Sequence, residues 1–380
     1  MSPVAANSAA AGPAATPRHA ERTRVDMLLL GFTLGMMAVG LVMVMSASGV
    51  MAELSFGDKY LFIKKQAVYA LVGLVIMAGA MVVDRGLLYR LTYPILGVAV
   101  LLLGATLAFG YEAGGARRWL HLGPVSMQPL EAAKVALVFY LAYFFSHKQE
   151  KVKTFSVGFL PPVAVTGLLG GLLLLQPDFG GAAFLCILLF LMSVVGGTSL
   201  IYLGSSLVLA LGCGWLLIAQ SEYRIKRWTA FLDPFGNAQD TGYQLVQSLY
   251  AFGSGGWTGQ GLGVGKQKLL FLPEAHNDFI LAVIGEELGF AGVSLVFVGL
   301  GIILWRAFAI SLAQQDAQDR FLGYGLTLIL AVGAVLNMSV VLGMAPPKGV
   351  PMPFMSYGGS SLIVSCFCVG MLLNLSRRRA

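Results

Sequence analysis

Charged residues are scarce in this sequence. Asp, Glu, Lys and Arg make up 11% of its 380 residues, whereas hydrophobic residues make up 57%. Soluble domains carry roughly 25% charged residues, and a soluble chain of this length could not bury so much apolar surface. A lipid bilayer solvates such a surface instead. We therefore predict an all-α polytopic membrane protein.

Cysteine and histidine are also rare, which argues against several kinds of site. The four cysteines lie in apolar runs, as is typical of small buried hydrophobic residues, and they suggest no disulfide framework (Cys186, Cys213, Cys366 and Cys368). The four histidines have no metal-ligand spacing. Four glycines between 259 and 265 fit neither phosphate-binding pattern, so we predict a flexible, close-packed loop there rather than a nucleotide site. We expect no nucleic-acid partner.

Long apolar runs are abundant. Ten of them have about the length that a helix needs to cross a bilayer. The predicted spans are 27–45, 67–83, 93–110, 132–146, 158–175, 181–196, 199–219, 279–304, 321–343 and 360–375. The first run has a basic flank like that of a signal peptide, but it is rather long for one, so we predict an uncleaved first helix.

These spans predict a single transmembrane domain over residues 26–376. A large extracytoplasmic loop over 220–277 separates the seventh helix from the eighth. Residues 1–25 are rich in Ala and Pro and predict a disordered cytoplasmic tail, and residues 377–380 form a short basic cytoplasmic tail. No internal repeat is strong enough to indicate an inverted-repeat transporter.

The loops are asymmetric in Lys and Arg. With the N-terminus inside, the cytoplasmic segments hold thirteen such residues and the short outer loops hold six. Because short cytoplasmic loops carry an excess of positive charge, this bias places both termini in the cytoplasm.

Unusual polar sequence gathers on the outer side of this topology. The segments are Gly114–Trp119 with Gln128–Lys134, Gln176–Gly180, Gln267–Phe279 and Pro346–Ser361. Loops that share one membrane face can converge around one cavity, so we expect these segments to form a single site.

Asp278 stands at the start of the eighth span. A helix N-terminus favours an ionised carboxylate, so this residue is either a plain helix cap or a general base at the bilayer surface. Glu286 and Glu287 lie on the same helix but on other faces, which predicts polar pairing inside the bundle for them.

Several other charged residues are candidates for binding substrate. Glu131 and Lys134 share a helix face and form either an internal ion pair or part of the cavity lining. Arg117, Arg118 and Lys348 lie beside Gly- or Pro-rich turns, which suit cations that face a pyrophosphate. His276 and Lys268 complete the candidate set, and His276 alternatively is a surface histidine.

Together, in order, these motifs resemble those of the SEDS family (shape, elongation, division and sporulation proteins). The matching stretches are Gly115-Ala116-Arg117-Arg118-Trp119, Gln128-Pro129-x-Glu131-x-Ala133-Lys134, Gln176-Pro177-Asp178-Phe179-Gly180, Leu272 to Ile280, Gly285-Glu286-Glu287-Leu288-Gly289, and Pro351-x-Pro353-Phe354-x-Ser356-Tyr357-Gly358-Gly359-Ser360-Ser361. Lys348-Gly349 resembles the division branch more than the elongation branch. Leu130 departs from the family pattern, which usually has Ser there.

The resemblance implies a SEDS fold and a peptidoglycan glycosyltransferase at the outer face of the bacterial cytoplasmic membrane, at the division septum. Its substrates would be lipid II and the nascent glycan strand. Asp278 would act as general base in an inverting reaction, with Arg117, Arg118, Lys134 and Lys348 as candidates to stabilise the leaving pyrophosphate. A divalent cation (Mg or Mn) could assist, although no ligand cluster demands one.

The resemblance also implies protein partners, namely a cognate class B penicillin-binding protein (an FtsI-like transpeptidase) and other divisome membrane proteins. Two alternatives remain open, a lipid II flippase and a non-catalytic divisome scaffold. A flippase should have polar features on both faces and at mid-membrane, and a scaffold would not need an acid ringed by basic loops.

Overall fold

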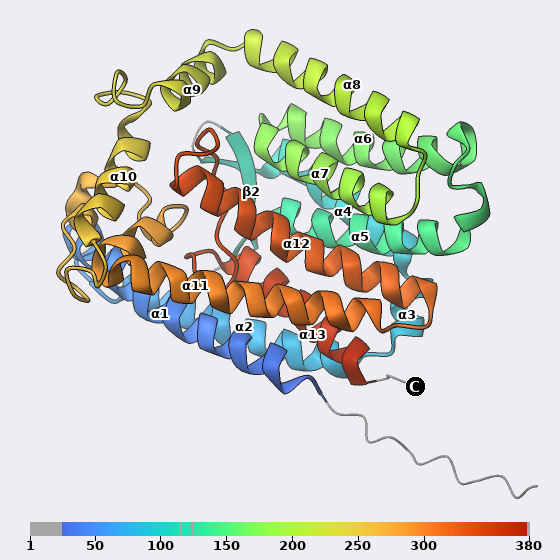
Figure 1. Ribbon diagram of the computed structural model, residues 1–380, viewed down its shortest axis with the longest axis horizontal. Coiled ribbons are helices and arrows are strands. Elements are labelled where there is room, and N and C mark those ends of the chain that lie inside the picture. The colour runs from blue at the N-terminus through green and yellow to red at the C-terminus, as the bar shows by residue number, and fades with distance from the viewer. Residues whose placement is uncertain (1–24, 114–115, 123–124, 378–380) are drawn as a thin grey trace, which may run out of the picture.

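The computed structural model describes residues 25–113, 116–122 and 125–377 (Figure 1). The predicted tails therefore lie almost wholly outside the described residues. Within them the chain is a bundle of helices with one small sheet. The long helices are α1 (Met27–Phe56), α2 (Leu61–Val82), α4 (Thr92–Phe109), α5 (Pro129–His147), α6 (Leu160–Leu175), α7 (Phe179–Val195), α8 (Leu200–Ala219), α11 (Ile280–Leu312), α12 (Ala317–Val341) and α13 (Gly359–Arg377).

Each predicted span coincides with one of these helices. In the described part of the chain nine helical segments are long and apolar enough to cross a membrane, and α6 reaches that length with the π-helical turn η2 (Phe155–Phe159) before it. The tenth, α7, has 17 residues, which is the lower end of the usual span length. The predicted all-α polytopic fold is confirmed.

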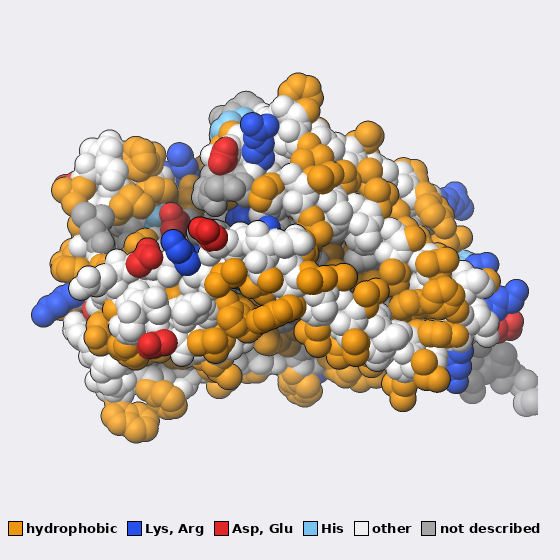
Figure 2. All heavy atoms as spheres, turned by 90° about the horizontal axis from the view of Figure 1, so that it is seen from above, with side chains coloured by type: hydrophobic (Ala, Val, Ile, Leu, Met, Phe, Trp, Pro, Cys, Tyr) orange, Lys and Arg blue, Asp and Glu red, His pale blue; other side chains and the backbone are white. Residues whose placement is uncertain are grey.

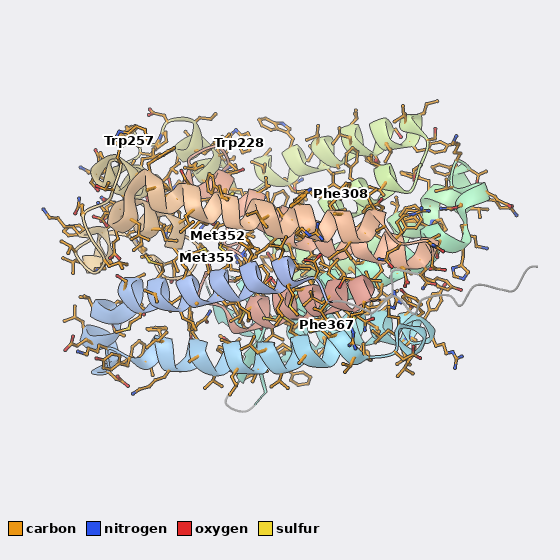
Figure 3. The ribbon with its side chains drawn as sticks, turned by 60° about the horizontal axis from the view of Figure 1, so that its bottom comes forward. Trp228, Trp257, Phe308, Met352, Met355 and Phe367 are labelled. Carbon is orange, nitrogen blue, oxygen red and sulfur yellow. The ribbon has the colours of Figure 1, made fainter. Side chains whose placement is uncertain are left out.

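The helices differ greatly in how much of their surface the protein covers. In the most apolar stretch of α5, 78% of the residues are buried, and for α13 the share is 72%, but for α8 it is only 6%. Accordingly α5, α12 and α13 form the centre of the bundle, and α8 lies along its edge (Figure 1). Between helices, Met352 and Met355 fill the core close to α1 (Figure 3).

Charged side chains gather towards the two ends of the bundle. Figure 2 shows Lys, Arg, Asp and Glu around a hollow at one end and a further group at the other, with mainly hydrophobic side chains between them. This is the distribution that a bilayer requires, because its core solvates apolar groups and its surfaces solvate charges.

A small antiparallel sheet between α4 and α5 was not predicted. Its strands are β1 (Tyr111–Ala113), β2 (Ala116–Leu122) and β3 (Val125–Met127), in the order β1-β2-β3. Tyr111 pairs with Trp119, and Leu120 pairs with Met127. Strands this short leave too little alternation of polar and apolar residues to be recognised in the sequence.

The predicted outer loop contains α9 (Glu222–Leu232), α10 (Tyr243–Gly255) and the π-helical turn η3 (Gln267–Phe271). Its glycine run packs closely on α11, as predicted. Gly259 has φ +80°, and a Cβ there would lie 2.1 Å from the carbonyl oxygen of Glu287. Only glycine permits both that conformation and that approach.

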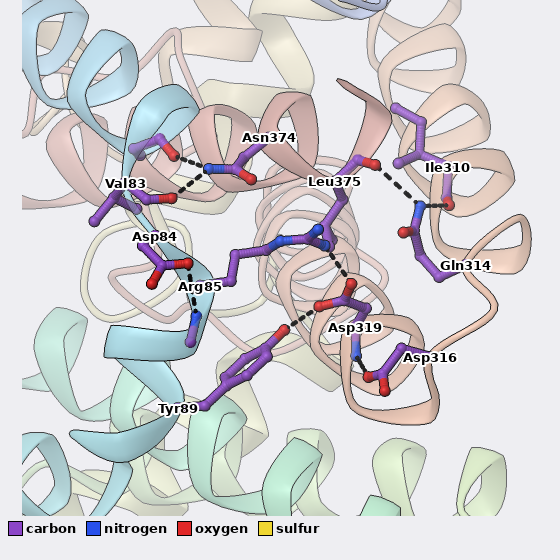
Figure 4. Close-up of polar contacts among 12 residues, drawn as sticks. Val83, Asp84, Arg85, Tyr89, Ile310, Gln314, Asp316, Asp319, Asn374 and Leu375 are labelled. Atoms are coloured by element: carbon purple, nitrogen blue, oxygen red, sulfur yellow. Dashed lines mark hydrogen bonds and ion pairs between the residues drawn. The ribbon is translucent and has the colours of Figure 1, made fainter. Parts of the chain in front are cut away.

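At the opposite end of the bundle, the short helix α3 (Arg85–Arg90) contacts the start of α12 (Figure 4). Asp319 accepts hydrogen bonds from Arg85 and Tyr89. Asn374 donates to the carbonyl oxygens of Ala80 and Val83, which ties α13 to the end of α2.

Candidate active site

Asp278 lies just before α11 rather than at its N-cap. The N-cap is Phe279, and the Asp278 carboxylate makes no hydrogen bond with any residue that the structure describes. The structure therefore does not support the plain helix cap, and the carboxylate is left available for chemistry.

The backbone around Asp278 is fixed by a buried amide on α12. Asn337 is 1% exposed. Its Nδ2 donates to the carbonyl oxygens of Asp278 at 2.7 Å and Val350 at 2.8 Å. One side chain thus holds the segment before α11 against the segment after α12. Sequence reasoning missed Asn337, although a polar residue inside an apolar span is a signal for such a role.

The segment after α12 also packs against the carboxylate itself. A Cβ at Gly349 would lie 3.1 Å from Asp278 Oδ2. Glycine at this position lets the backbone approach the acid closely, which narrows the space in which the carboxylate can move.

Burial, and after it the negative charge of Glu274, raise the pKa of Asp278 to about 7, against the positive charges of Arg118 and Arg227. The sequence predicted that the helix N-terminus would favour the ionised form. The loss of hydration outweighs that effect here, because removing a carboxylate from water penalises its charged form. A pKa near the operating pH suits a general base.

Basic residues from three segments meet beside α7. Arg118 on β2 lies 3.5 Å from Asp178, measured from Nε to Oδ1. Lys348 and Arg224 both lie over the ring of Phe179, at 5.5 and 5.6 Å from its centroid. Burial lowers the pKa of Lys348, and the charge of Asp178 opposes that shift.

Two arginines of α9 belong to this basic cluster, which we define as Arg118, Arg224, Arg227 and Lys348. Arg227 donates to the carbonyl oxygen of Pro347 at 3.3 Å, which links α9 to the Lys348 segment. Sequence reasoning counted Arg224 and Arg227 only as loop charges. Their spacing of three residues on a helix was the available signal that they share a face.

Two other predicted site residues, Arg117 and His276, differ in their exposure. Arg117 is exposed on β2. His276 is 5% exposed, with its ring 4.7 Å from that of Phe62 and 5.5 Å from that of Tyr357. It is therefore not a surface histidine, and burial lowers its pKa.

Glu131 and Lys134 form a buried ion pair within α5. Lys134 Nζ lies 2.7 Å from Glu131 Oε1 and 4.2 Å from the centroid of the Phe184 ring. The predicted shared face is confirmed, and the geometry matches the internal pair. A contact of either residue with substrate stays a prediction.

Lys268 likewise has a protein partner. Its Nζ lies 2.6 Å from Glu287 Oε1 and 3.1 Å from the hydroxyl of Ser46, and that hydroxyl donates to Glu287. Glu286 accepts from the backbone of Lys266 and Gln267. These contacts confirm the predicted polar pairing of Glu286 and Glu287, while substrate binding by Lys268 stays a prediction.

A divalent cation held by the protein alone would need a set of acidic or imidazole ligands. Among the described residues no three His, Cys, Asp or Glu side chains come together in a way that could hold a metal ion. A cation shared between one carboxylate and the substrate's phosphates needs no such cluster, so a Mg or Mn ion stays a prediction, and the charge compensation that the protein itself offers here comes from the basic cluster.

The model of a family of cell cycle proteins that covers FtsW, RodA and SpoVE matches residues 26–380. The chain belongs to this family. Curated relatives include a probable peptidoglycan glycosyltransferase FtsW of Trichlorobacter lovleyi, 46% identical over 92% of this chain and 93% of that protein. Stage V sporulation protein E of Bacillus subtilis is 36% identical over 94% of this chain and 98% of that protein.

Solved structures of the SEDS family share the fold. A chain from a peptidoglycan synthase complex superimposes with a TM-score of 0.76 at 29% identity, over 93% of this chain and 98% of that one. The rod shape determining protein RodA of Thermus thermophilus gives a TM-score of 0.67 at 29% identity, over 93% of this chain and 97% of that one. The predicted resemblance to the SEDS family is confirmed, and the relatives named FtsW favour its division branch.

Proposed function

We propose that this protein is a peptidoglycan glycosyltransferase that polymerises lipid II into glycan strands during cell division. Its family and the activity named for its FtsW relatives support the reaction class. The observation that carries the site is Asp278, an acid with a pKa of about 7 held between Gly349 and the charges of Arg118 and Arg227.

In the proposed reaction Asp278 takes the proton of the acceptor 4-hydroxyl. The acceptor oxygen then forms a bond to the anomeric carbon of the donor, while the bond from that carbon to the pyrophosphate oxygen breaks. Undecaprenyl pyrophosphate leaves with the electron pair, and the anomeric configuration inverts. A base with a pKa near 7 is ionised in a large share of molecules at neutral pH and still accepts a proton readily.

The leaving pyrophosphate gains negative charge, which fixed cations stabilise when they are already in place. The basic cluster of Arg118, Arg224, Arg227 and Lys348 supplies them, and three of the four are arginines, whose planar group matches phosphate oxygens. Arg117 and Lys134 were predicted for the same task. Arg117 is exposed on β2, and Lys134 is engaged by Glu131, so the cluster is the stronger candidate.

This chain would work beside a transpeptidase. A solved neighbour belongs to a peptidoglycan synthase complex in which polymerisation is coordinated with crosslinking. By analogy the partner here is a class B penicillin-binding protein, and the proposed location is the division septum of the cytoplasmic membrane, with both termini in the cytoplasm.

The test is polymerisation of labelled lipid II by the purified protein with its transpeptidase partner, followed on a gel. Asp278→Asn keeps the shape of the side chain but removes the base, so we expect product formation to fall at least about 100-fold. Asp240→Asn, in an exposed part of the outer loop that precedes Asp278, is the matched control and should retain activity.

Full activity in Asp278→Asn would overturn the site. Absence of product from the wild-type protein with its partner would overturn the enzyme, and lipid II transfer between the leaflets of vesicles would then be measured to test the flippase.

A further inference from the structure

A polar pocket opens at the end of the bundle away from Asp278. It has a volume of about 460 Å³ and lies between the bend after α5, the end of α7, the end of α11 and the first turns of α12. Its lining combines polar groups with apolar ones: Gln149, Val152, Lys153, Val195, Gly196, Gly197, Leu312, Arg320, Phe321 and Tyr324.

Two cations line this pocket without a carboxylate partner. Among the described residues neither Lys153 nor Arg320 forms an ion pair. Asp319, the acid next to Arg320 in the chain, is held by Arg85 and Tyr89 instead (Figure 4). Lys153 is exposed and Arg320 is partly exposed, so both charges can reach a ligand in the pocket.

Exposed apolar side chains form part of the rim of the pocket. Val195 is 41% exposed and Leu312 is 55% exposed, and both line it. Phe308, 47% exposed, lies one turn before Leu312 on α11 and packs on Tyr324, towards the end of the bundle away from Trp228 and Trp257 (Figure 3). Apolar surface thus continues from the pocket along the outside of α11.

The charges and exposed apolar side chains of the pocket define which kind of ligand would fit it. A ligand that fits it has a negative head, to meet Lys153 and Arg320, and a hydrocarbon tail, to cover the exposed side chains of α7 and α11. The pocket lies where four membrane-spanning helices begin or end, which is the depth of lipid headgroups. In the predicted topology this is the cytoplasmic side, where basic pockets between helices bind anionic headgroups.

We infer that this pocket binds an anionic phospholipid, with the headgroup phosphate between Lys153 and Arg320 and an acyl chain along α11. The site lies at the opposite end of the bundle from Asp278. It does not depend on the proposed enzymatic activity.

The test is native mass spectrometry of the full chain in detergent, titrated with phosphatidylglycerol or with phosphatidylcholine of the same acyl chains. We expect the wild-type protein to prefer phosphatidylglycerol. In the double variant Lys153→Gln with Arg320→Gln the apparent affinity should fall about 25-fold, because each cation near an anionic headgroup contributes roughly fivefold. Phosphatidylcholine binding should not change.

A matched control removes two charges from the same bend without touching the lining. Lys148 and Lys151 are exposed and outside the pocket, so Lys148→Gln with Lys151→Gln should keep most of the preference. Lys153→Arg with Arg320→Lys should keep it as well, which guards against a variant that simply misfolds.

Three results would overturn the inference. The first is an equal loss in the control pair, which would mean that diffuse charge attracts the lipid. The second is the same affinity for both lipids in the wild-type protein. The third is displacement of the lipid by millimolar glycerol 3-phosphate, which would mean that a soluble phosphate fills the pocket.

Discussion

At the scale of single residues, the environment of Asp278 lowers the stability of the folded protein when the carboxyl group is ionised. Burial raises its pKa to about 7, so the folded protein binds a proton there more tightly than the unfolded chain does. A carboxyl group with a raised pKa costs stability as pH rises from its unfolded value towards its folded value. The protein tolerates this cost at the position where a base is useful, as is common at active sites.

Glu274→Gln should move the pH dependence of polymerisation. The ionised form of Asp278 is the base, so the initial rate should rise as pH rises through about 7. Removing the negative charge of Glu274, which raises the pKa of Asp278, should shift this limb to lower pH. The measurement is the initial rate of lipid II polymerisation from about pH 5.5 to about pH 8.5.

Glu53→Gln is the control for that experiment, because Glu53 is exposed on α1 and is not among the charges that act on Asp278. A midpoint that stays in place in Glu274→Gln, or moves to higher pH, would contradict the electrostatic account.

At the scale of elements, the site is made where two loop segments meet at the ends of α11 and α12. Asn337 bonds both backbones, and Gly349 allows their close approach. The position of Asp278 is therefore set by contacts between elements rather than by its own helix.

Gly349→Ala tests that approach. Its new Cβ would lie 3.1 Å from Asp278 Oδ2, so the carboxylate must shift by a few tenths of an ångström, and we expect the rate of polymerisation to fall about tenfold. Gly358→Ala, whose Cβ would have ordinary contacts at 3.9 Å in the same segment, should change the rate less than about twofold. Equal rates for Gly349→Ala and wild type would show that the acid tolerates displacement.

Lys268 and Glu287 fasten the outer loop to α11. Either Lys268→Met or Glu287→Gln leaves a buried polar group without its partner. Loss of one member of a buried ion pair costs about 3–5 kcal/mol, so both single variants should unfold at lower denaturant than wild type, and the double variant should recover most of the loss.

The same double variant separates two roles of Lys268. If Lys268 only fastens the loop, the double variant should regain polymerisation together with stability. If Lys268 also contacts substrate, the double variant should be stable but inactive.

The elements differ in how well the sequence predicts them. The spans are predictable because a helix in lipid must present about 20 apolar residues in a row, and α5, α11 and α12 appear where the runs lie. The sheet around Trp119 is not predictable, because its strands are too short to show an alternation of polar and apolar residues. The candidate site was predicted as far as Asp278, Arg118 and Lys348, which stand in recognisable motifs. Arg224, Arg227 and Asn337 join it only through packing between distant segments, which one sequence does not reveal.

At the scale of the whole molecule, the two charged ends face different sides of the membrane. The excess of Lys and Arg in the predicted cytoplasmic loops predicts that Asp278 lies on the outer side, where lipid-linked donor and acceptor would reach it. The pocket of Lys153 and Arg320 then lies on the inner side.

Cysteine labelling tests this orientation. Asn277→Cys, in a background where the exposed Cys186 and Cys213 are changed to Ala, should react with a membrane-impermeant maleimide on intact cells. Ala313→Cys, exposed at the other end of α11, should react only after the membrane is permeabilised. The reverse pattern would invert the topology.

Two of the buried ion pairs among the described residues also differ in when they can form. Glu131 and Lys134 lie three residues apart on α5, whereas Lys268 and Glu287 come from separate elements. Among the nine described helices long enough to span a membrane, α5 has the lowest mean hydropathy, and two bare charges would add several kcal/mol to its transfer into lipid. An ion pair within one helix forms without contact from any other helix. The two charges of α5 can therefore neutralise each other at the translocon, and α5 can enter the bilayer before the surrounding helices have been synthesised.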